Sequence, residues 1–585
     1  MSKIVRGIAA AGGRAMGRAR FVEWDIPRVE HRTISPSDVD AEMARFREAR
    51  SRAVQEMHWL REAAAGRIGV IEAKVFESQA LMIDDPDLVE GTEAYISANY
   101  LSAERAFDWQ LIELRIRMLD TGHALVMDRL ADLRDVRLRV LSQLLGRELP
   151  SLTSSADSDP EIVLTDELPP SLAVSLDPRD VAGFVTAGGS RGSHSVLLAR
   201  AMGIPAIVGL GESIVEIGEG QLLLMDGGTG VITAEPDERE LELHRTAVLQ
   251  REERRVRLSA HAGEPVITRD GQRVVMLANL DQPDDAEAAK RLGAEGIGLL
   301  RTEFLVIGRR TIPDVEDQFS AYQQVVEAFP DAEISLRTFD IGGDKFPLFL
   351  SMPSEENPYL GWRAIRVCLE HPELFRNQLT AALRAGVGSQ LRIMLPFVIN
   401  LDEILRTREQ LNELAQEAGI EQVPQLGIMI ETPAALDTLD LLAPHIEFVS
   451  LGTNDLTQYS LAVDRGNAHL AALYDPMHPA LIRGYTRLVR TAAEFGLDLG
   501  VCGELAAAPL GACLLVGLGY RKLSVSVTAL PEISDLLRHV SADALAEVCG
   551  ALRDVTSGQE ARARLEEYLV TSNPAYSTSP VGLSK

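Results

Sequence analysis

The sequence predicts a multidomain α/β protein whose C-terminal half is an eight-stranded parallel (β/α)8 barrel, or TIM barrel. First, 585 residues are too many for one domain, and 46% hydrophobic with 25% charged residues is the balance of a soluble globular chain. Second, eight strand-like segments alternate with helical segments over the C-terminal half, at about the length that such a barrel needs. Third, nearly every apolar segment ends in polar residues, and barrels of this kind carry active sites at that edge.

The sequence pattern of the N-terminal half predicts smaller domains. Residues 2–22 have the pattern of a short strand and turn, whereas residues 35–149 repeat apolar residues at helical spacing with a break at Asp85-Pro86, as in a helical bundle. Short strands then return and predict an α/β domain with the bundle as an insertion. The charged segment that follows favours a linker helix. The predicted parts are 1–30 (N-terminal strand of the α/β domain), 31–149 (bundle), 150–235 (α/β domain), 236–262 (linker helix), 263–575 (barrel) and 576–585 (tail).

Charge and cysteine usage narrow the partners. The net charge of −28, from 58 basic and 86 acidic residues, argues against nucleic acid and favours a basic surface on another protein. The four cysteines show no CxxC spacing, which is typical of a reducing cytoplasm and argues against a zinc site. The N-terminus lacks the apolar core of a signal peptide, and the longest uncharged run is short and contains Pro509. We therefore expect a cytoplasmic protein without membrane insertion.

One histidine stands in a glycine-rich turn within residues 186–209, TAGGSRGSHSVLLARAMGIPAIVG. His194 is expected at the start of an apolar helix that Ser193 can cap. The free N–H groups of the first helical turn, together with Arg200, make a favourable place for an anion. Because neutral imidazole is nucleophilic near pH 7, His194 is a candidate carrier of a phosphoryl group. A hydrogen-bonded histidine in a turn is the alternative interpretation of this stretch alone.

Arginines gather at the predicted rim of the barrel. Arg301 and Arg337 end two strands, Arg465 lies just beyond the sixth strand, and Arg363 stands in GWRAIR. Guanidinium groups bind phosphate and carboxylate through paired hydrogen bonds. Surface ion pairs are the alternative, but they fit poorly where several arginines belong to apolar strands.

Two carboxylates and a thiol share this rim. Glu431 in IMIETP and Asp455 in GTND follow consecutive strands, and two carboxylates plus a substrate phosphate are a usual way to hold Mg²⁺; alternatively, these acids only hold the arginines. Cys502 in GVCGEL is a candidate proton donor or nucleophile, with a buried structural thiol as the alternative. The set fits a small anion such as phosphoenolpyruvate, because loss of its phosphoryl group leaves an enolate that needs a proton on carbon.

The motifs VSLGTNDLTQYSLAVDR (449–465), GLLRTEFL, DIGGDK, ENPYLGWRAIR, IMIETPAA and VCGEL closely resemble those of Enzyme I of the bacterial sugar phosphotransferase system. The members of this family are phosphoenolpyruvate–protein phosphotransferases, and the resemblance extends to about residue 575. It implies that His194 accepts the phosphoryl group on Nε2 and passes it to a histidine of the small carrier HPr. It also implies that the helical insertion docks HPr and that the barrel domain forms a homodimer.

The resemblance assigns roles to the rim by motif match. Cys502 would protonate enolpyruvate, and Glu431 with Asp455 would hold Mg²⁺. The residues implied in binding phosphoenolpyruvate are Arg301, Arg337, Arg363, Asn454, Asp455 and Arg465.

The departures from the family pattern lie outside the barrel. Where the family usually has GGRTSH this chain has GSRGSH, with Ser190 and Gly192 as the changed residues. A family threonine expected to hold the active histidine corresponds to Ala173, so a backbone carbonyl or Ser190 is expected to fix the tautomer instead. In the expected docking helix, Gln79 stands where many members carry histidine.

Related families make the alternatives explicit. Pyruvate phosphate dikinase and phosphoenolpyruvate synthase share the histidine domain and the barrel, but they need a further ATP-binding domain for which this sequence has no room. The nitrogen-branch form of Enzyme I carries an N-terminal sensory domain, whereas this chain starts directly at the predicted strand. The remaining alternative is a regulatory protein that senses phosphoenolpyruvate without transferring phosphate, supported only by the changes around His194.

Overall fold

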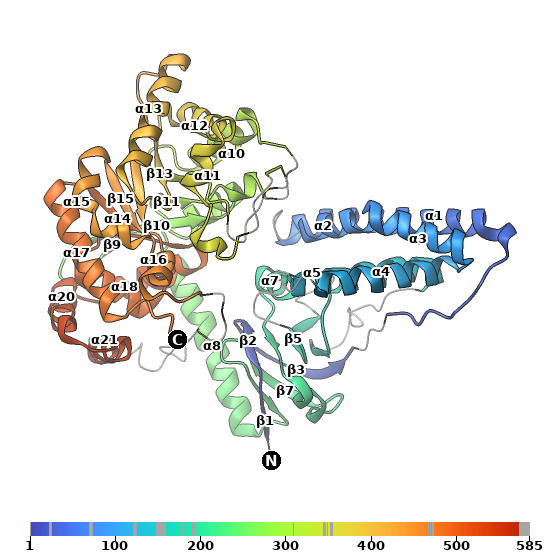
Figure 1. The fold of residues 1–585 in the computed structure, drawn as a ribbon. Coiled ribbons are helices and arrows are strands. Elements are labelled where there is room, and N and C mark those ends of the chain that lie inside the picture. Colours follow the sequence, from blue (N-terminus) through green and yellow to red (C-terminus); the bar gives the residue numbers. More distant parts are fainter. Residues whose placement is uncertain are drawn as a thin grey trace. The chain divides into compact units, whose positions relative to one another are not determined.

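The computed structural model describes residues 2–572 apart from short interruptions. The residues outside the description in this range are 23–25, 69–73, 121–125, 148–159, 175, 177–179, 190–193, 308, 310, 343–346, 348, 351–354, 466, 468–469 and 471–472. The chain divides into two compact units, Met1–Glu252 and Glu253–Lys585 (Figure 1).

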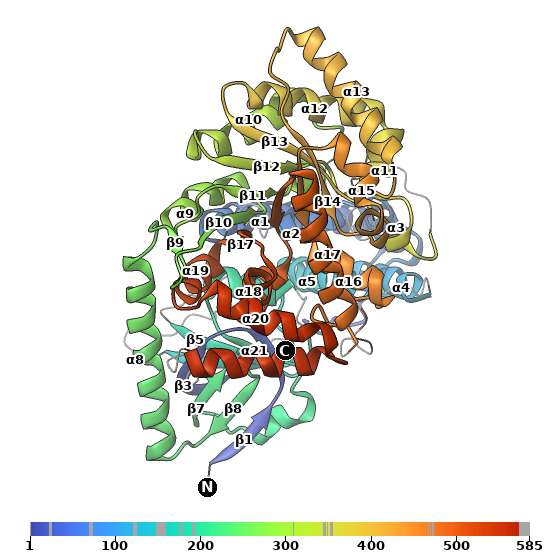
Figure 2. The ribbon, with the colours of Figure 1, turned by 90° about the vertical axis from the view of Figure 1, so that its left-hand side faces the viewer.

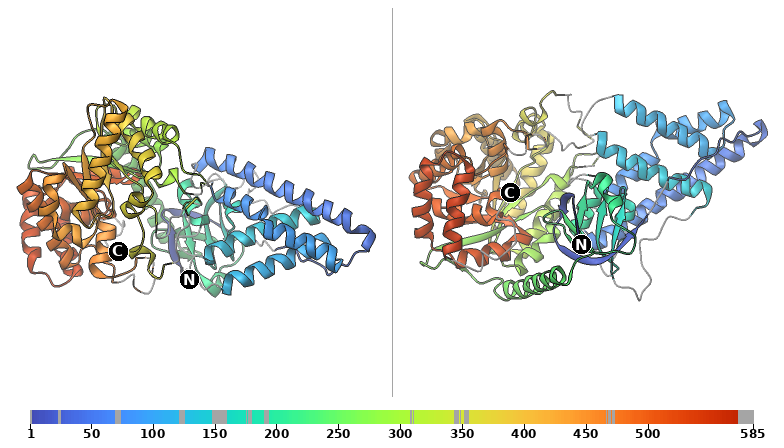
Figure 3. Two further views of the ribbon diagram at one scale, coloured as in Figure 1. Left: turned by 45° about the horizontal axis from the view of Figure 1, so that its top comes forward. Right: turned by 90° about the horizontal axis from the view of Figure 1, so that it is seen from below.

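Long helices make up much of the first unit, and Figure 3 shows them lying alongside one another in blue. Their apolar positions turn inward: the ring of Phe46 packs on Phe107 with centroids 6.0 Å apart. The predicted break is present at Asp85, whose carboxylate accepts backbone N–H groups of the next helix. The helices are α1 (Val39–Ile68), α2 (Lys74–Ile83), α3 (Pro86–Asn99), α4 (Ala103–Asp120) and α5 (Val126–Leu145), so the pattern over residues 104–145 forms two helices.

A mixed sheet of eight described strands completes the first unit, in the order β1-β8-β7-β3-β4-β5-β6-β2. β3 and β4 are adjacent and parallel although the bundle helices lie between them in the sequence. The short helices α6 (Pro170–Ala173) and α7 (His194–Met202) accompany the sheet. The strands are β1 (Lys3–Arg6), β2 (Ile8–Ala11), β3 (Arg14–Phe21), β4 (Glu161–Thr165), β5 (Val181–Thr186), β6 (Ala206–Val208), β7 (Leu222–Asp226) and β8 (Val231–Ala234).

The N-terminal stretch differs from the expected single short strand. Residues 2–22 contain three strands, because glycines interrupt the extended chain. A Cβ at Gly7 would lie 2.4 Å from the Leu210 side chain, and Gly13 has a φ of +144°, which a side chain disfavours.

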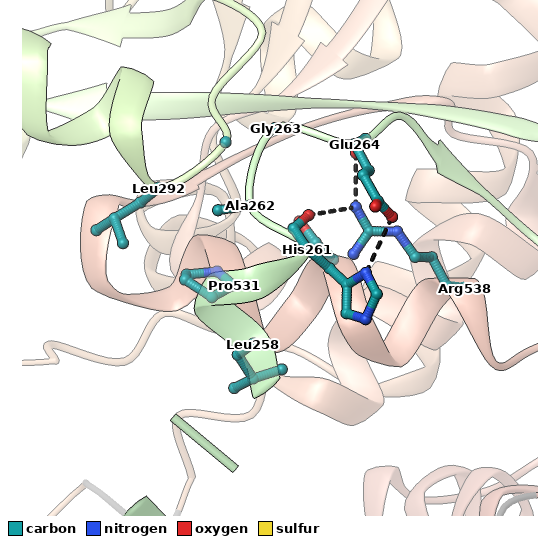
Figure 4. Close-up of a pocket in the computed structure, with 10 residues that line it drawn as sticks. Leu258, His261, Ala262, Gly263, Glu264, Leu292, Pro531 and Arg538 are labelled. Atoms are coloured by element: carbon teal, nitrogen blue, oxygen red, sulfur yellow. Dashed lines mark hydrogen bonds and ion pairs between the residues drawn. The ribbon is translucent and has the colours of Figure 1, made fainter. Parts of the chain in front are cut away.

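The helix α8 (Glu238–Ala260) lies where the linker helix was predicted. The segment directly after α8 is held by Arg538 of α19 (Leu530–Arg538), whose Nη2 donates to the carbonyls of His261 and Glu264 at 3.3 and 2.6 Å (Figure 4). These groups line a small cavity of about 10 Å³. Because guanidinium donors satisfy carbonyls that a helix end leaves free, this end of α8 is firmly part of the second unit.

The second unit contains the predicted barrel. Its eight parallel strands close through pairing of the first strand with both the second and the last, and the short β9 (Val266–Ile267) joins antiparallel. All eight predicted strands are confirmed. They are β10 (Arg273–Leu280), β11 (Ile297–Leu300), β12 (Glu333–Arg337), β13 (Gln390–Leu395), β14 (Leu426–Ile430), β15 (Phe448–Leu451), β16 (Asp498–Val501) and β17 (Lys522–Ser526).

Helices surround these strands in the second unit, as Figure 2 shows. The strands are almost wholly buried and carry mainly Val, Ile, Leu and Met, as expected where both faces are covered. No helix in the described part of the chain is long and apolar enough to cross a bilayer. The helices are α9 (Ala286–Arg291), α10 (Val315–Ala328), α11 (Ile365–Glu370), α12 (Pro372–Gly386), α13 (Leu401–Ala418), α14 (Pro433–Asp437), α15 (Leu439–Leu442), α16 (Thr453–Leu461), α17 (Pro479–Phe495), α18 (Pro509–Leu518), α19 (Leu530–Arg538), α20 (Ala542–Ala551) and α21 (Gly558–Ser572).

Candidate active site

The C-terminal ends of the barrel strands bring most of the predicted site residues to one edge. Arg301 follows β11, Arg337 ends β12, and Glu431 follows β14. Asp455 lies in the first turn of α16 after β15, and Cys502 follows β16. Because parallel strands all end at the same edge of a barrel, side chains far apart in the sequence share this rim.

Arginines and carboxylates alternate at the rim in one continuous network. Arg337 donates to Glu303 at 2.6 Å and lies 3.3 Å from Asp340. Arg363 binds the same Asp340 through two hydrogen bonds of 3.0 Å, and its Nη2 lies 3.3 Å from Asp455. All five residues are at most 6% exposed. Paired guanidinium–carboxylate bonds in a buried place fix the direction of each group as well as its charge.

These arginines are permanent cations. Burial alone would lower the pKa of Arg337, but Glu303 and Asp340 outweigh that effect and hold it above its ordinary value. For Arg363 burial likewise acts to lower the pKa, and Asp340 with Asp455 raises it overall. Both guanidinium groups therefore keep their charge in a buried place, where electrostatic interactions are stronger than in water.

Two atoms of the network have no hydrogen-bond partner: Arg337 Nε and Asp455 Oδ1 are buried and unpaired. Leaving buried polar atoms unpaired is unfavourable, so a ligand that pairs with them would gain binding free energy. One is a donor suited to an anion and the other an acceptor suited to a cation. The rim is therefore suited to bind an anion and a cation together.

Glu431 and Asp455 fit a divalent cation. Glu431 is 2% exposed, and burial followed by the nearby Asp455 and Asp340 charges raises its pKa to about 8. A cation between the carboxylates would relieve this repulsion, and Asp455 Oδ1 is free to bind it. The described residues include no cluster of three or more His, Cys, Asp or Glu that could hold a metal ion. A bound anion would have to supply further ligands.

Cys502 is held as a protonated thiol. Burial raises the pKa of Cys502 to about 11, so the thiol stays protonated at neutral pH. Its carbonyl accepts a hydrogen bond of 3.0 Å from Asn279 Nδ2, and its Sγ lies 3.7 Å from the carbonyl of Leu451. The residue packs in a buried apolar cluster with Leu299, Met394, Met429 and Phe448.

Three further predicted residues lie around this network. Arg301 pairs with Asp281 at 2.7 Å and keeps about a third of its side chain exposed. Asn454 accepts the backbone N–H of Glu504 at 3.0 Å. Arg465 follows α16; partial desolvation acts to lower its pKa, but the nearby Asp455 charge raises the pKa overall.

Several residues of the rim were not assigned a role from the sequence. Glu303, Asp340 and Asn279 also lie at strand ends, and they bind Arg337, Arg363 and the Cys502 carbonyl respectively. The signal that identifies them is the same strand-end position. A residue without such a signal is Phe397, whose backbone N–H donates to Glu431 at 2.7 Å.

His194 lies in the first unit and begins α7, as predicted. Ser190, Gly192 and Ser193, for which a tautomer-fixing, conformational or capping role was expected, lie outside the described residues. Arg200, expected beside an anion, donates Nε to the carbonyl of Ala10 at 2.7 Å.

The two remaining departures from the family pattern are buried. Ala173 in α6 is fully buried. Gln79 is also fully buried and donates to Asp132 and Asp135 at 3.2 and 3.3 Å. Gln79 therefore holds α2 to α5 rather than offering a docking surface.

Comparison with known proteins places these features in a family. Three family models match the chain: "PEP-utilising enzyme, N-terminal" over residues 6–129, "PEP-utilising enzyme, mobile domain" over 157–230 and "PEP-utilising enzyme, PEP-binding domain" over 256–542.

Curated relatives match over nearly the whole chain. The phosphoenolpyruvate-protein phosphotransferase of Priestia megaterium is 35% identical over 92% of this chain and 95% of its own length. The protein of the same name from Haemophilus influenzae is 34% identical over 97% of this chain and 100% of its own. That of Bacillus subtilis is 35% identical over 90% and 92%. The chain therefore belongs to the phosphoenolpyruvate-protein phosphotransferase family.

Proposed function

We propose that this chain transfers the phosphoryl group of phosphoenolpyruvate to its own His194 and from there to a histidine of the small carrier HPr. The observation that carries the proposal is the buried network at the barrel rim. It offers an unpaired guanidinium N–H on Arg337 and an unpaired carboxylate oxygen on Asp455, beside the protonated thiol of Cys502.

The rim residues bind and orient the substrate. Arg337 and Arg363 would neutralise the phosphate, while Arg301, Asn454 and Arg465 would complete the hold on the phosphate and carboxylate. Phosphoryl transfer depends mainly on charge neutralisation and in-line alignment, which fixed guanidinium groups supply. Glu431 and Asp455 would hold Mg²⁺, which when bound supplies further charge neutralisation at the phosphate.

His194 and Cys502 would carry out the bond-making and proton-transfer steps. The Nε2 lone pair of His194 forms a bond to phosphorus, and the bond from phosphorus to the enol oxygen breaks with its electron pair on oxygen. The resulting enolate takes a proton from the Cys502 thiol onto its methylene carbon and becomes pyruvate. Water then returns a proton to the thiolate. A thiol with a raised pKa is in the correct protonation state for this role throughout the neutral range.

His194 belongs to the first unit and has two tasks, so we further propose hinges in the linker, residues 236–262, and at the junctions of the His194 domain. In support, the boundary between the compact units falls between Glu252 and Glu253, within α8. Rigid-body motion about such a segment is a common way to serve two sites.

HPr would dock on the helical bundle. Trp59 on α1 is 65% exposed and Leu81 on α2 is 44% exposed, and acidic side chains such as Glu77 lie on the same pair of helices. Exposed apolar side chains with acidic residues on the same helices suit a partner with a basic rim. We also propose a cytoplasmic homodimer formed through the barrel domain, which the molar mass of the full chain in solution would test.

Labelling tests the transfer itself. Full-length chain incubated with ³²P-phosphoenolpyruvate and Mg²⁺ should acquire acid-labile, base-stable label that maps to His194 and moves to added HPr. The His194→Ala chain is the control and should stay unlabelled. Absence of label on the unaltered chain, with phosphoenolpyruvate still bound, would instead favour the phosphoenolpyruvate-sensing regulator, for which Ser190, Gly192 and Ala173 are the supporting changes.

A further inference from the structure

The strand β13 differs from its neighbours at the rim. Its neighbours β12 and β14 lead into Arg337 and Glu431, whereas β13 is followed by Pro396 and Phe397, which carry no polar side chain. The structure shows that this strand nevertheless serves the site, through the backbone and the ring of Phe397.

The backbone of Phe397 holds a carboxylate. Its N–H donates to Glu431 Oε1 at 2.7 Å, and its φ is +61°. Residues with a Cβ rarely adopt this left-handed region, and they persist there only where the surroundings enforce it. The direction of an N–H depends on the adjoining backbone angles, so the unusual conformation and the hydrogen bond to Glu431 belong together.

The ring of Phe397 holds an arginine. The Cζ atoms of Arg363 and Arg366 each lie 4.7 Å from its centroid, which is cation–π distance. Tyr459 meets the same ring edge-on at 5.6 Å and accepts a hydrogen bond of 2.9 Å from Arg363. Ring, phenol and the Asp340 carboxylate thus restrict the Arg363 guanidinium from three directions.

Backbone strain concentrates around the same arginine. Ala364, next to Arg363, has a φ of +55°, and at Gly342, with a φ of +123°, a Cβ would lie 2.4 Å from Arg363 Cβ. Strain of this kind gathers where a site needs a geometry that ordinary backbone does not provide. The non-glycine residues with positive φ in the described part of the chain are Tyr100, Glu235, Ala364, Phe397 and Ala462.

We propose that Phe397 is a positioning residue of the phosphotransfer site: its N–H sets the carboxylate of Glu431, and its ring sets the guanidinium of Arg363. One residue thereby fixes the distance between the group that would hold the cation and the group that would hold the phosphoryl end. The inference rests on the proposed function for its consequence in catalysis, but the geometry it claims is open to a measurement without turnover.

Two variants of the full chain separate the two contacts. Phe397→Leu removes the aromatic face and keeps the N–H, whereas Phe397→Gly also releases the backbone from its left-handed conformation. Tyr100→Gly is the matched control, because it releases a φ of +50° at the exposed end of α3 in the first unit. The readouts are binding of Mn²⁺ in the presence of inorganic phosphate as the anion, followed by electron paramagnetic resonance, the split between kcat and KM for phosphoenolpyruvate, and the melting temperature.

We expect Phe397→Gly to weaken Mn²⁺ binding about tenfold, because outer groups that orient a metal ligand have effects of this size. Phe397→Leu should bind Mn²⁺ within about twofold of the unaltered chain and lower kcat about tenfold with little change in KM. Neither variant should lower the melting temperature more than a few degrees, and Tyr100→Gly should leave Mn²⁺ binding and kcat unchanged.

Unchanged Mn²⁺ affinity in Phe397→Gly would overturn the proposal. A loss of Mn²⁺ affinity that is accompanied by a large fall in melting temperature would also overturn it, because unfolding would then explain the loss. Weakened Mn²⁺ binding in a chain that never labels His194 would support the positioning role and contradict the proposed function. The positioning role of Phe397 and the proposed function can therefore be contradicted independently.

Discussion

The two ends of the barrel contain similar charged groups arranged in opposite ways. At the N-terminal end, Arg392 and Lys522 bind Glu333 and Asp498, with Lys522 at 2.6 Å from each carboxylate. The Arg392 guanidinium also lies 3.9 Å above the ring of Phe448. None of these polar atoms is among the buried unpaired atoms of the described residues. Two cations and two anions satisfy one another, and nothing is left to bind a ligand.

The C-terminal end leaves groups open. Arg337 Nε and Asp455 Oδ1 are buried without partners. The pKa values show the same contrast: burial acts to raise the pKa of Asp498, but Lys522 and Arg392 lower it overall, whereas burial and nearby carboxylates raise the pKa of Glu431 to about 8. A complete network stabilises the fold, while an incomplete one is available for substrate.

The largest effect on activity is expected at the rim. Arg337→Lys keeps the charge but loses the planar fork that binds Glu303 and Asp340, so we expect kcat/KM for phosphoenolpyruvate to fall about a thousandfold. Steady-state kinetics with HPr as acceptor measure it. Arg384→Lys, in an exposed pair with Glu316, is the control and should leave the kinetics unchanged. A loss below tenfold would contradict the importance of the fork.

A substitution at the N-terminal end of the barrel should lower stability rather than activity. Arg392→Met leaves Glu333 and Asp498 one cation short, which should lower the free energy of unfolding by about 2 to 4 kcal/mol, allowing for the partial exposure of both acids. Urea unfolding of the full chain measures it, and kcat at 25 °C should stay within about twofold. The control Arg376→Met breaks an exposed pair with Glu417. It should lower the free energy of unfolding by less than about 1 kcal/mol. Equal losses in the two variants would remove the distinction between the ends.

Cys502 allows a matched pair of thiol variants. Cys502→Ala should slow turnover about a hundredfold or more, the usual scale for a positioned acid, because the enolate loses its proton donor. Cys513→Ala removes a fully buried thiol of α18 away from the rim. It should lower stability slightly and leave turnover unchanged. A near-wild-type rate in Cys502→Ala would eliminate this thiol as the donor.

A smaller effect concerns pH. Folding raises the pKa of Glu431 from 4.5 to about 8. Between these values the folded chain keeps a proton that the unfolded chain has lost, so stability falls as pH rises through this window. Glu431→Gln should remove that contribution and raise the melting temperature at pH 8 without divalent cation by about 2 °C, while abolishing activity. No gain at pH 8 relative to pH 5 would show that the carboxylate is not strained in the fold.

The strand-end rule explains how much the sequence could predict. The barrel strands can be recognised in the sequence because buried parallel strands are continuous apolar runs. The polar residues at or just after the ends of these runs can be recognised with them: Arg301, Arg337, Glu431, Asp455 and Cys502. Phe397 is invisible to such reasoning, because a backbone N–H has no residue signature and depends on a left-handed φ. Its recognition required coordinates.

The first unit shows other limits. Three strands replace the single expected one because glycines at 7 and 12–13 interrupt too short a pattern for periodicity to resolve. Gln79 lay on a helix expected to dock a partner, yet its side chain is fully buried against Asp132 and Asp135. Helical spacing places a residue on a helix, whereas tertiary packing decides which face is covered.

The most direct test of the account is calorimetric titration of the His194→Ala chain with phosphoenolpyruvate and Mg²⁺. If the rim binds substrate and His194 only accepts the phosphoryl group, this chain should bind one phosphoenolpyruvate per subunit about as tightly as the unaltered chain, with no label transferred. The Arg337→Lys chain should bind far more weakly in the same experiment. Loss of binding on removal of His194, or unchanged binding in the rim variant, would contradict the division of labour between barrel and histidine.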